Sequence, residues 1–587
     1  MRILLLHPED TPWRGEWSRH PWDVIVDLSF AGPSTYDDWS RRTGARIFSM
    51  YRFAGETESY RWVNQIFELG RGRLLDRMGL DWWEILSMES YQSMQLIYLL
   101  EQLRSELSVP DAELFATRPH LFTRLAQQLL GRSIPTFETG RIGPAQRAAR
   151  TLRSVKNLRP AQIAEISLDK WDLTYRIRRH TMHGKLAHLQ KPALLLPSAY
   201  SNVTRSVLAY AEQLPHRQFL LATTRRSAIA QHRPENVASV PLAPYAQSAD
   251  TIATESRDLQ RSWKDFLSTM ITNNEVFRTA AAAGLWDYFP AHLHKGLLLR
   301  EAWKNLITSE PISGVLCGDD LNHNTRLPLL LAARSGLRAI YCSHGALDGG
   351  FLFKKPVADT YLVKGEMESD YLQRVSAIRP EKIVVAAPAA SNAVSSSDPS
   401  RDALVFFSQP YEVAGVRSDC IYRELLPGLC SVASSNGRKV VVKLHPFESR
   451  RARQALVNSI LPRDVQGMVE IVDGRPPEEV MARAWCGITV DSSVAVECAL
   501  RKIPFFLCGW LDFTGMGYLQ QFARFEVACV LKQPQDILSI PQKLLEFEPD
   551  PAKLRKLWHA ADPASLDQIL FGASVVNSPE HVRPLLR

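Results

Sequence analysis

The chain has 587 residues, of which 45% are hydrophobic and 22% are charged, a balance typical of a soluble protein with two or more cored domains. It has no apolar run of about eighteen residues, which excludes a membrane-spanning helix. The net charge of +8 is uneven, because twelve Lys or Arg residues stand against three acids in segment 141–191. No nucleic-acid-binding motif accompanies this segment. Its partner is therefore expected to be an anionic phospholipid surface or an anionic glycan, and a solvated helical face is the alternative.

The N-terminal part begins with two predicted strands, at 2–8 and 23–30. The first lacks the length and small-residue cleavage site of a signal peptide, so it is interpreted as a buried strand. Apolar residues at mixed three- and four-residue spacing then indicate helices, and we expect a helical insertion over about 50–190. Alternating strands and helices resume at KPALLLPS and QFLLATT.

A helical stretch at 249–310 precedes four further predicted strands. They lie in GVLCGDD, RAIYCSHG, DTYLVKG and EKIVVAAP. The segment 389–401, AASNAVSSSDPSR, is small, polar and proline-bearing, as interdomain linkers are. After it, short apolar runs and helical patterns alternate as a compact series of βα units. The sequence thus predicts an α/β fold with two doubly wound parallel sheets, in domains 1–388 and 402–587 joined by that linker.

All eight cysteines lie after residue 316, several within predicted strands, and their spacing matches no metal-ligand motif. They are interpreted as reduced, buried thiols of a cytoplasmic protein, and no metal site is predicted.

Polar residues follow four of the predicted strands. They are GDD (318–320), SHG (343–345), KLHP (443–446) and DSS (491–493). In parallel α/β sheets ligands bind outside the carboxyl ends of strands. Hydroxyls and free N–H groups at a helix start suit a phosphate, so Ser492 and Ser493 predict a nucleotide-phosphate site.

KLHP, DSS and the following Glu497 resemble nucleotide-binding elements of GT-B glycosyltransferases that use cytidine nucleotides. The HP and Ser-Ser pairs are similar to those of bacterial sialyltransferases, polysialyltransferases and capsular β-Kdo transferases. SQP (408–410) is similar to the Gln-Pro element of the Kdo transferases, which brings in Gln409. The set of SHG, KLHP and DSS also resembles CDP-glycerol glycerophosphotransferases. The resemblance covers about residues 312–510 and implies two Rossmann-like domains facing a cleft.

The resemblance implies a role for each matched residue on the donor side. Ser492 and Ser493 would hold the donor phosphate, and His445 would hydrogen-bond it and, when cationic, help the nucleotide leave. Glu497 would hold the ribose hydroxyls, with a solvent-facing helix carboxylate as the alternative. Lys443, on the same strand face as His445, would add positive charge or cap a sheet edge. Pro446 and Asp491 complete the two motifs.

Three residues are candidates for the catalytic base. Asp319 or Asp320 resembles the acidic base in the Asp/Glu-Asp/Glu-Gly motif of sialyltransferases, although Leu321 replaces the glycine. His344 resembles the histidine base of the glycerophosphotransferases. The sequence leaves the choice open, and it predicts that closure of the cleft brings the base to the acceptor.

The expected function is therefore a metal-independent GT-B glycosyltransferase of bacterial surface or capsular polysaccharide synthesis. It would transfer Kdo or a sialic-acid-like sugar from a CMP-activated donor to a glycan or lipid-linked glycan, with no cofactor beyond the donor. We expect a cytoplasmic location, peripheral on the inner membrane face through 141–191. The alternatives are a CDP-glycerol-type glycerophosphotransferase, a UDP-sugar 2-epimerase and a non-catalytic GT-B-like scaffold.

Overall fold

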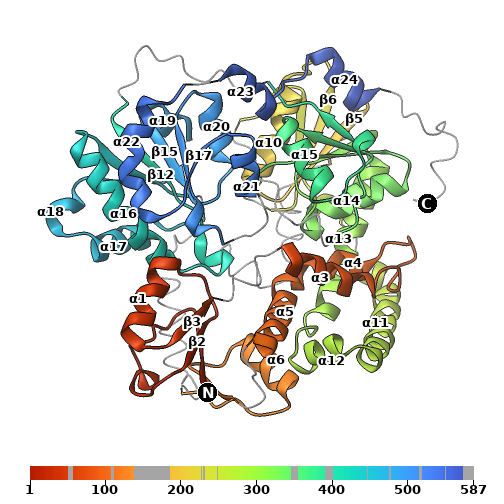
Figure 1. The fold of residues 1–587 in the computed structure, drawn as a ribbon. Coiled ribbons are helices and arrows are strands. Elements are labelled where there is room, and N and C mark those ends of the chain that lie inside the picture. Colours follow the sequence, from red (N-terminus) through yellow and green to blue (C-terminus); the bar gives the residue numbers. More distant parts are fainter. Residues whose placement is uncertain are drawn as a thin grey trace. The chain divides into compact units, whose positions relative to one another are not determined.

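The computed structural model contains three parallel sheets flanked by helices (Figure 1). It describes residues 1–49, 57–106, 112–137, 186–225, 228, 232–246, 249–345, 354–389, 401–445, 447–474, 477–513, 518–548 and 550–572. Contacts divide the chain into two compact units. Unit 1 comprises Met1–Tyr60, Ser93–Ile163 and Ser391–Leu554, and unit 2 comprises Arg61–Gln92, Ala164–Ala390 and Arg555–Arg587.

Unit 1 contains a six-stranded sheet in the order β14-β13-β12-β15-β16-β17. Its strands are β12 (Ala403–Phe407), β13 (Lys439–Lys443), β14 (Val469–Val472), β15 (Ala484–Thr489), β16 (Phe505–Cys508) and β17 (Cys529–Leu531). Counted along the chain, this is the 3-2-1-4-5-6 order of a Rossmann fold. The order reverses between β12 and β15, so this sheet has its switch point there.

The core of this sheet follows from strands that are apolar on both faces. Helices α16 (Ser418–Ser435) and α17 (Arg450–Ile460) pack on it, with Leu425 and Val457 in the same buried cluster as Phe406. The remaining helices are η9 (Tyr411–Ala414), α18 (Arg463–Gln466), α19 (Pro477–Ala482), α20 (Val494–Leu500), η10 (Gly509–Leu511), α21 (Tyr518–Arg524), η11 (Pro534–Ser539), α22 (Ile540–Leu545) and α23 (Pro551–Leu557). Strands buried on both faces are typical of parallel sheets covered by helices.

Unit 1 also holds a four-stranded parallel sheet in the order β3-β2-β1-β4. Its strands are β1 (Arg2–Leu6), β2 (Val24–Asp27), β3 (Arg46–Ser49) and β4 (Glu113–Ala116), and the helices of this region are η1 (Glu16–Arg19), α1 (Pro33–Thr43), α5 (Tyr91–Glu106) and α6 (Leu121–Leu130). A buried ion pair of 2.9 Å between Asp27 and Arg417 ties this sheet to the six-stranded one. A backbone bridge between Phe30 and Val416 does the same.

Unit 2 is built on a seven-stranded sheet in the order β11-β10-β9-β8-β5-β6-β7. Its strands are β5 (Ala193–Ser198), β6 (Gln218–Thr223), β7 (Val237–Pro241), β8 (Ile312–Cys317), β9 (Arg338–Cys342), β10 (Thr360–Val363) and β11 (Ile383–Val385). The order is that of a Rossmann sheet with one added strand, and its switch point lies between β5 and β8.

Some helices of unit 2 contact this sheet, others pack on helix α13 (Phe289–Ser309), and together they bury an aromatic and ionic core. They are α3 (Thr57–Glu68), α4 (Trp82–Ser87), η2 (Met88–Ser90), α10 (Ser201–Glu212), η5 (Ala243–Tyr245), η6 (Ala249–Ile252), α11 (Ala253–Asn273), α12 (Glu275–Ala282), α13 (Phe289–Ser309), α14 (His323–Arg334), α15 (Glu366–Arg374), η8 (Pro380–Lys382) and α24 (Pro563–Phe571). The predicted core role of the helical aromatics is confirmed at Trp82 and Trp83, which are fully buried. The segment that carries them also supplies buried carboxylates, since Glu84 pairs with Arg326 and Asp76 with Arg300.

The predicted α/β fold with Rossmann-like parallel sheets is confirmed, and the third, four-stranded sheet is an addition. Strand β4 lies inside the region predicted as a helical insertion, which is therefore not wholly helical. The contact-based units partition the chain differently from the sequential domains 1–388 and 402–587, whose boundaries stay a prediction.

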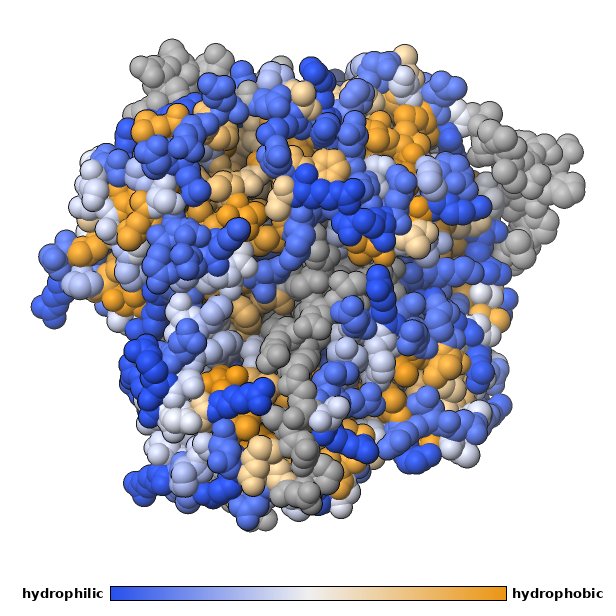
Figure 2. All heavy atoms as spheres, in the orientation of Figure 1, coloured by the Kyte–Doolittle hydropathy of each residue, from blue (hydrophilic) through white to orange (hydrophobic). Residues whose placement is uncertain are grey.

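No helix in the described ranges is both long enough and apolar enough to cross a bilayer. Figure 2 shows hydrophilic side chains interspersed with small apolar patches on the face it presents. Most of the basic segment 141–191 lies outside the described residues, because the structure does not describe residues 138–185. All eight cysteines are free thiols, and seven of them are buried.

Candidate functional site

At the switch point of the six-stranded sheet, the side chain of Gln409 joins the ends of β12 and β15. Its Nε2 donates to the carbonyl oxygen of Asp491, and its Oε1 accepts from the Asp491 backbone N–H at 3.1 Å. The predicted nucleotide residues Gln409 and Asp491 are thus brought together. The Gln409 amide bonds the backbone just after the neighbouring strand, so it holds the ends of β12 and β15 together.

His445 follows β13 and lies in a tight turn. Its Nδ1 accepts a hydrogen bond from the backbone N–H of Phe447 at 3.2 Å, so the proton of the neutral ring is on Nε2. Burial, followed by the positive charge of Lys443, lowers the pKa of His445 to about 4. At neutral pH, His445 is therefore a neutral hydrogen-bond donor. The expected cationic form would need an anion to restore its pKa.

Glu448 holds this turn in place, a role that sequence reasoning missed. Its Oε2 accepts from the backbone N–H of His445 at 2.8 Å, and its Oε1 accepts from Ser408 Oγ at 2.8 Å and Arg453 Nε at 2.7 Å. Burial raises the pKa of this carboxyl above its usual value. The signal available in the sequence was a carboxylate three residues after a strand-end histidine, which suits capping of the turn.

The DSS motif follows β15 and leads into α20. Ser492 Oγ accepts from the backbone N–H of Val494 at 3.4 Å, whereas the side chain of Ser493, at the N-cap, makes no capping hydrogen bond. Helix α20 has seven residues, so its dipole is short and the hydroxyls are the stronger donors to an anion. Glu497 is half-buried one turn into the same helix.

Lys443 and Pro446 are the remaining residues of the predicted donor set. The Lys443 side chain is buried, and its ammonium donates to the carbonyl of Leu444 at 2.7 Å. Burial lowers the pKa of Lys443, and the positive charge of Lys443 contributes to the lowered pKa of His445. Pro446 lies outside the described residues.

Asp320, at the carboxyl end of β8, is part of a buried ionic network in unit 2. It is 1% exposed, and its carboxylate contacts Lys354 and, at 3.1 Å, Arg326. Arg326 in turn bonds Glu84. This carboxylate is enclosed by two cations and has no free side toward solvent, so the arrangement favours a structural role.

Asp319 and His344 lie at the carboxyl ends of β8 and β9. Both carboxylate oxygens of Asp319 accept hydrogen bonds from its own loop, from the Leu321 N–H at 2.9 Å and from Asn322 Nδ2 at 2.6 Å. His344 Nδ1 lies 2.7 Å from the carbonyl oxygen of Gly318. A carbonyl only accepts, so Nδ1 carries the proton and Nε2 holds the lone pair. In this tautomer, Nε2 of His344 is the nitrogen that can accept a proton, as a base must.

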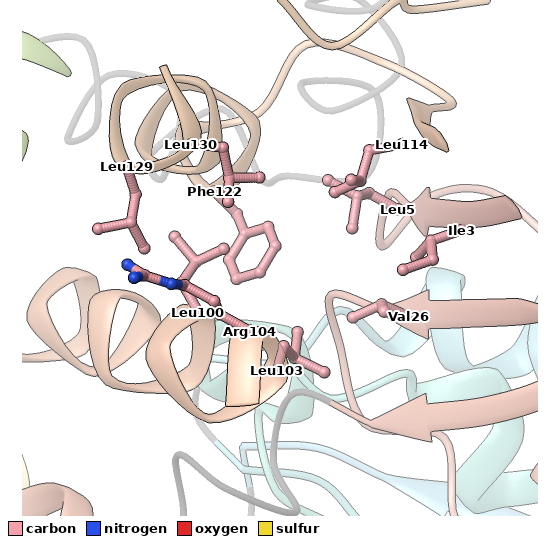
Figure 3. Close-up of a pocket in the computed structure, with 10 residues that line it drawn as sticks. All are labelled: Ile3, Leu5, Val26, Leu100, Leu103, Arg104, Leu114, Phe122, Leu129 and Leu130. Atoms are coloured by element: carbon pink, nitrogen blue, oxygen red, sulfur yellow. The ribbon is translucent and has the colours of Figure 1, made fainter. Parts of the chain in front are cut away.

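Among the described residues, no three His, Cys, Asp or Glu side chains are grouped so that they could hold a metal ion. An apolar cavity of about 20 Å³ lies in unit 1 beside β1, α5 and α6 (Figure 3). It has space for about one water molecule, so it is a packing defect and too small for a nucleotide or a lipid chain.

No protein-family model and no curated protein sequence matches the chain. Solved structures resemble it distantly. S. aureus MnaA, solved with UDP, is 11% identical and matches over 65% of this chain and 95% of its own, with a TM-score of 0.38. The calicheamicin glycosyltransferase CalG4 is 11% identical over 65% and 98% of the two chains, with a TM-score of 0.39.

A variant of the wall teichoic acid polymerase TagF is 10% identical to this chain. The match covers 73% of this chain and 97% of the polymerase, with a TM-score of 0.36. Similarity at this level does not identify a function.

Proposed function

We propose that this protein is a nucleotide-sugar-dependent glycosyltransferase whose donor site is the carboxyl edge of β12, β13 and β15. The observation that supports this most is the convergence of a Rossmann strand order with polar strand ends at the switch point. There, Gln409 joins the two strands, Glu448 fixes the His445 turn, and Ser492 and Ser493 present hydroxyls. Of these groups, His445, Ser492 and Ser493 can donate hydrogen bonds to a phosphate.

The chemistry follows from the protonation of these groups. A neutral His445 with its proton on Nε2 can donate to a phosphate oxygen, and the anion would raise the imidazole pKa from about 4. In transfer, an acceptor oxygen forms a bond to the anomeric carbon as the bond from that carbon to the phosphate oxygen breaks. The nucleotide leaves with the bonding electrons, and the acceptor proton goes to a base.

The donor is proposed to be a CMP-activated sugar of the Kdo or sialic-acid type, and the product a bacterial surface or capsular polysaccharide. Support comes from the motifs KLHP, DSS and SQP, whose described residues occupy one sheet edge. Thermal-shift measurements with CMP, CDP and UDP would test the nucleotide. We expect the largest stabilisation by CMP, whereas a preference for UDP would favour a UDP-sugar 2-epimerase and a preference for CDP a glycerophosphotransferase. No stabilisation by any of them would favour a scaffold.

A paired substitution tests the site itself. Replacing Ser492 and Ser493 together by alanine should weaken CMP binding by several-fold to a few hundredfold, because one or two charge-assisted hydrogen bonds of about 1.5–3 kcal/mol are lost. Ser459, whose hydroxyl bonds the carbonyl of Leu456 on the surface of α17, provides the matched control. Ser459→Ala should bind CMP as the unmodified protein does. Unchanged affinity in a folded Ser492/Ser493 double variant would remove the DSS motif from the site.

A further inference from the structure

An exposed aromatic ring lies on the turn that follows β13, beside the proposed donor site. Phe447 is 61% exposed, and among the described phenylalanines only Phe547 is also exposed. A single exposed ring is common on protein surfaces, but this one touches the histidine assigned to the donor phosphate. The ring centres of Phe447 and His445 are 4.9 Å apart, and their planes are inclined by 58°. The position of Phe447 therefore makes it a candidate contact for the ligand.

The turn holds this ring on a fixed backbone. The N–H of Phe447 donates to Nδ1 of His445 at 3.2 Å, and the N–H of Glu448 donates to the carbonyl oxygen of His445 at 2.9 Å. The N–H of His445 donates to Oε2 of Glu448 at 2.8 Å. The backbone N–H groups of all three residues are thus bonded within the turn. A ring presented in this way loses little backbone freedom when a ligand binds, which favours affinity.

The contact between the two rings indicates which part of a nucleotide Phe447 can reach. Since Nδ1 of His445 accepts the Phe447 N–H, the proton on Nε2 is the one that the imidazole can donate to a phosphate. In a nucleoside monophosphate only the ribose separates the phosphate from the base. A ring that touches the imidazole therefore lies within reach of the base. The base is also the one part of the nucleotide with a flat π face, which suits an exposed aromatic ring.

We propose that Phe447 stacks against the base of the donor nucleotide while His445 donates to its phosphate. This inference rests on the proposed donor site and adds recognition of the base to that of the phosphate. Both residues belong to unit 1, so the contact needs no residue of unit 2. A phenyl ring has no hydrogen-bonding atom, so it holds any base by its face and does not distinguish cytosine from uracil. Phe447 thus strengthens binding of every nucleotide, and base preference comes from other residues.

The first test is calorimetry with CMP, UMP and ribose 5-phosphate, which has the ribose and the phosphate but no base. The unmodified protein should bind both nucleotides more tightly than ribose 5-phosphate. Phe447→Ala should weaken binding of CMP and UMP by the same factor, about 5- to 100-fold, because one stacked base is lost. Its affinity for ribose 5-phosphate should stay unchanged. Phe447→Trp keeps a ring and should bind CMP at least as tightly as the unmodified protein.

Phe547→Ala provides the matched control, because Phe547 is the other exposed phenylalanine and follows α22 in the same unit. It should leave all three affinities unchanged. Phe447→Ala keeps the backbone N–H that bonds His445, so urea titration should show unchanged stability. An equal loss of affinity for CMP and for ribose 5-phosphate in Phe447→Ala would overturn the stacking, because the ring would then act only by supporting His445.

The affinities of the unmodified protein separate this inference from the donor assignment. Equal affinity for CMP and ribose 5-phosphate would overturn the stacking and leave the phosphate site in place. Binding of none of the three compounds would reject the donor site and the stacking together. A Phe447→Trp protein that binds CMP as weakly as Phe447→Ala would also contradict the stacking.

A second measurement observes the ring directly. 4-Fluorophenylalanine incorporated at position 447 gives a fluorine resonance whose chemical shift depends on what lies against the ring. CMP should move this resonance, and ribose 5-phosphate should move it much less. The same label at position 547 should respond to neither compound. Equal shifts at position 447 on addition of CMP and of ribose 5-phosphate would show that the base does not touch Phe447.

Discussion

At the switch point of the six-stranded sheet the polar side chains bond mainly to backbone groups, whereas in the unit of the seven-stranded sheet two carboxylates, Asp320 and Glu89, bond to ionisable side chains. Gln409, His445 and Glu448 each engage a neighbouring N–H or carbonyl. Asp320 and Glu89 instead engage cations or imidazoles. The first arrangement leaves neutral donors, which suit binding of an anion. The second fixes ionisable groups against one another, which suits structural support.

The largest effect should come from the ionic network of unit 2. Asp320→Ala would remove the carboxylate that pairs with the buried ammonium of Lys354 and with the guanidinium of Arg326. Removing one partner of a buried pair costs about 3–5 kcal/mol, and we expect this loss in the free energy of unfolding from urea titration. Asp38, which pairs with Arg42 on the surface at 2.7 Å, is the control, and Asp38→Ala should cost about 1 kcal/mol or less. Equal losses would contradict a structural role for Asp320.

A smaller effect is expected from Glu448 in unit 1. Glu448→Ala would remove the acceptor of the His445 N–H and of the Ser408 hydroxyl, and should cost about 1–3 kcal/mol of stability. Because the His445 turn loosens, CMP affinity should fall as well. Urea titration and isothermal calorimetry would measure the two quantities. Glu470→Ala, which removes an exposed partner of Arg483, should leave CMP affinity unchanged. A stable Glu448→Ala protein with normal affinity would show that Glu448 does not position His445.

The stability of the protein should depend on pH through two partly buried histidines, His445 and His120. The pKa of His445 and that of His120 are both about 4, mainly because of burial. Both lie below the unfolded value of about 6.5, so between these pH values the unfolded chain binds more protons. Stability is therefore full above about pH 6.5 and falls toward pH 4, with a slope of at most about 1.4 kcal/mol per pH unit for each imidazole. His445→Gln should reduce the slope measured by urea titration at several pH values, and an unchanged slope would contradict the low pKa.

Much of the fold could be predicted because its strands are short apolar runs that end in polar residues. The strands that were missed are those with a weaker signal. Strand β4 has the sequence ELFA inside a helical context, and β17 has only three residues. Their positions are set by pairing with β1 and β16, and pairing between distant segments leaves little trace in local composition.

The candidate site could be predicted only in part. The strand-end motifs identified Gln409, His445 and the serines, because strand ends are marked by local sequence. The hydrogen-bonding role of Glu448 depends on the conformation of a turn. The pair formed by Glu89 and His323 joins residues 234 positions apart in the chain. No spacing rule links such residues. Likewise, Asp319 and Asp320 belong to the same GDD motif, and only the cations around Asp320 distinguish the two.

The smallest effect should arise at Gln409, where the sheet edge is held by a single side-chain amide. Gln409→Ala removes both hydrogen bonds to the backbone of Asp491, each worth about 0.5–1.5 kcal/mol, and water can replace part of the loss at this half-buried position. We expect a modest loss of overall stability but faster amide hydrogen exchange at Asp491, whose N–H would lose its acceptor. Gln454, which bonds Asn458 on the exposed face of α17, offers the matched control. Gln454→Ala should leave the exchange rate at Asp491 unchanged. If Gln409→Ala also leaves that rate unchanged, the amide does not hold the two strand ends together, and Gln409 would be available to contact the nucleotide as the resemblance implied.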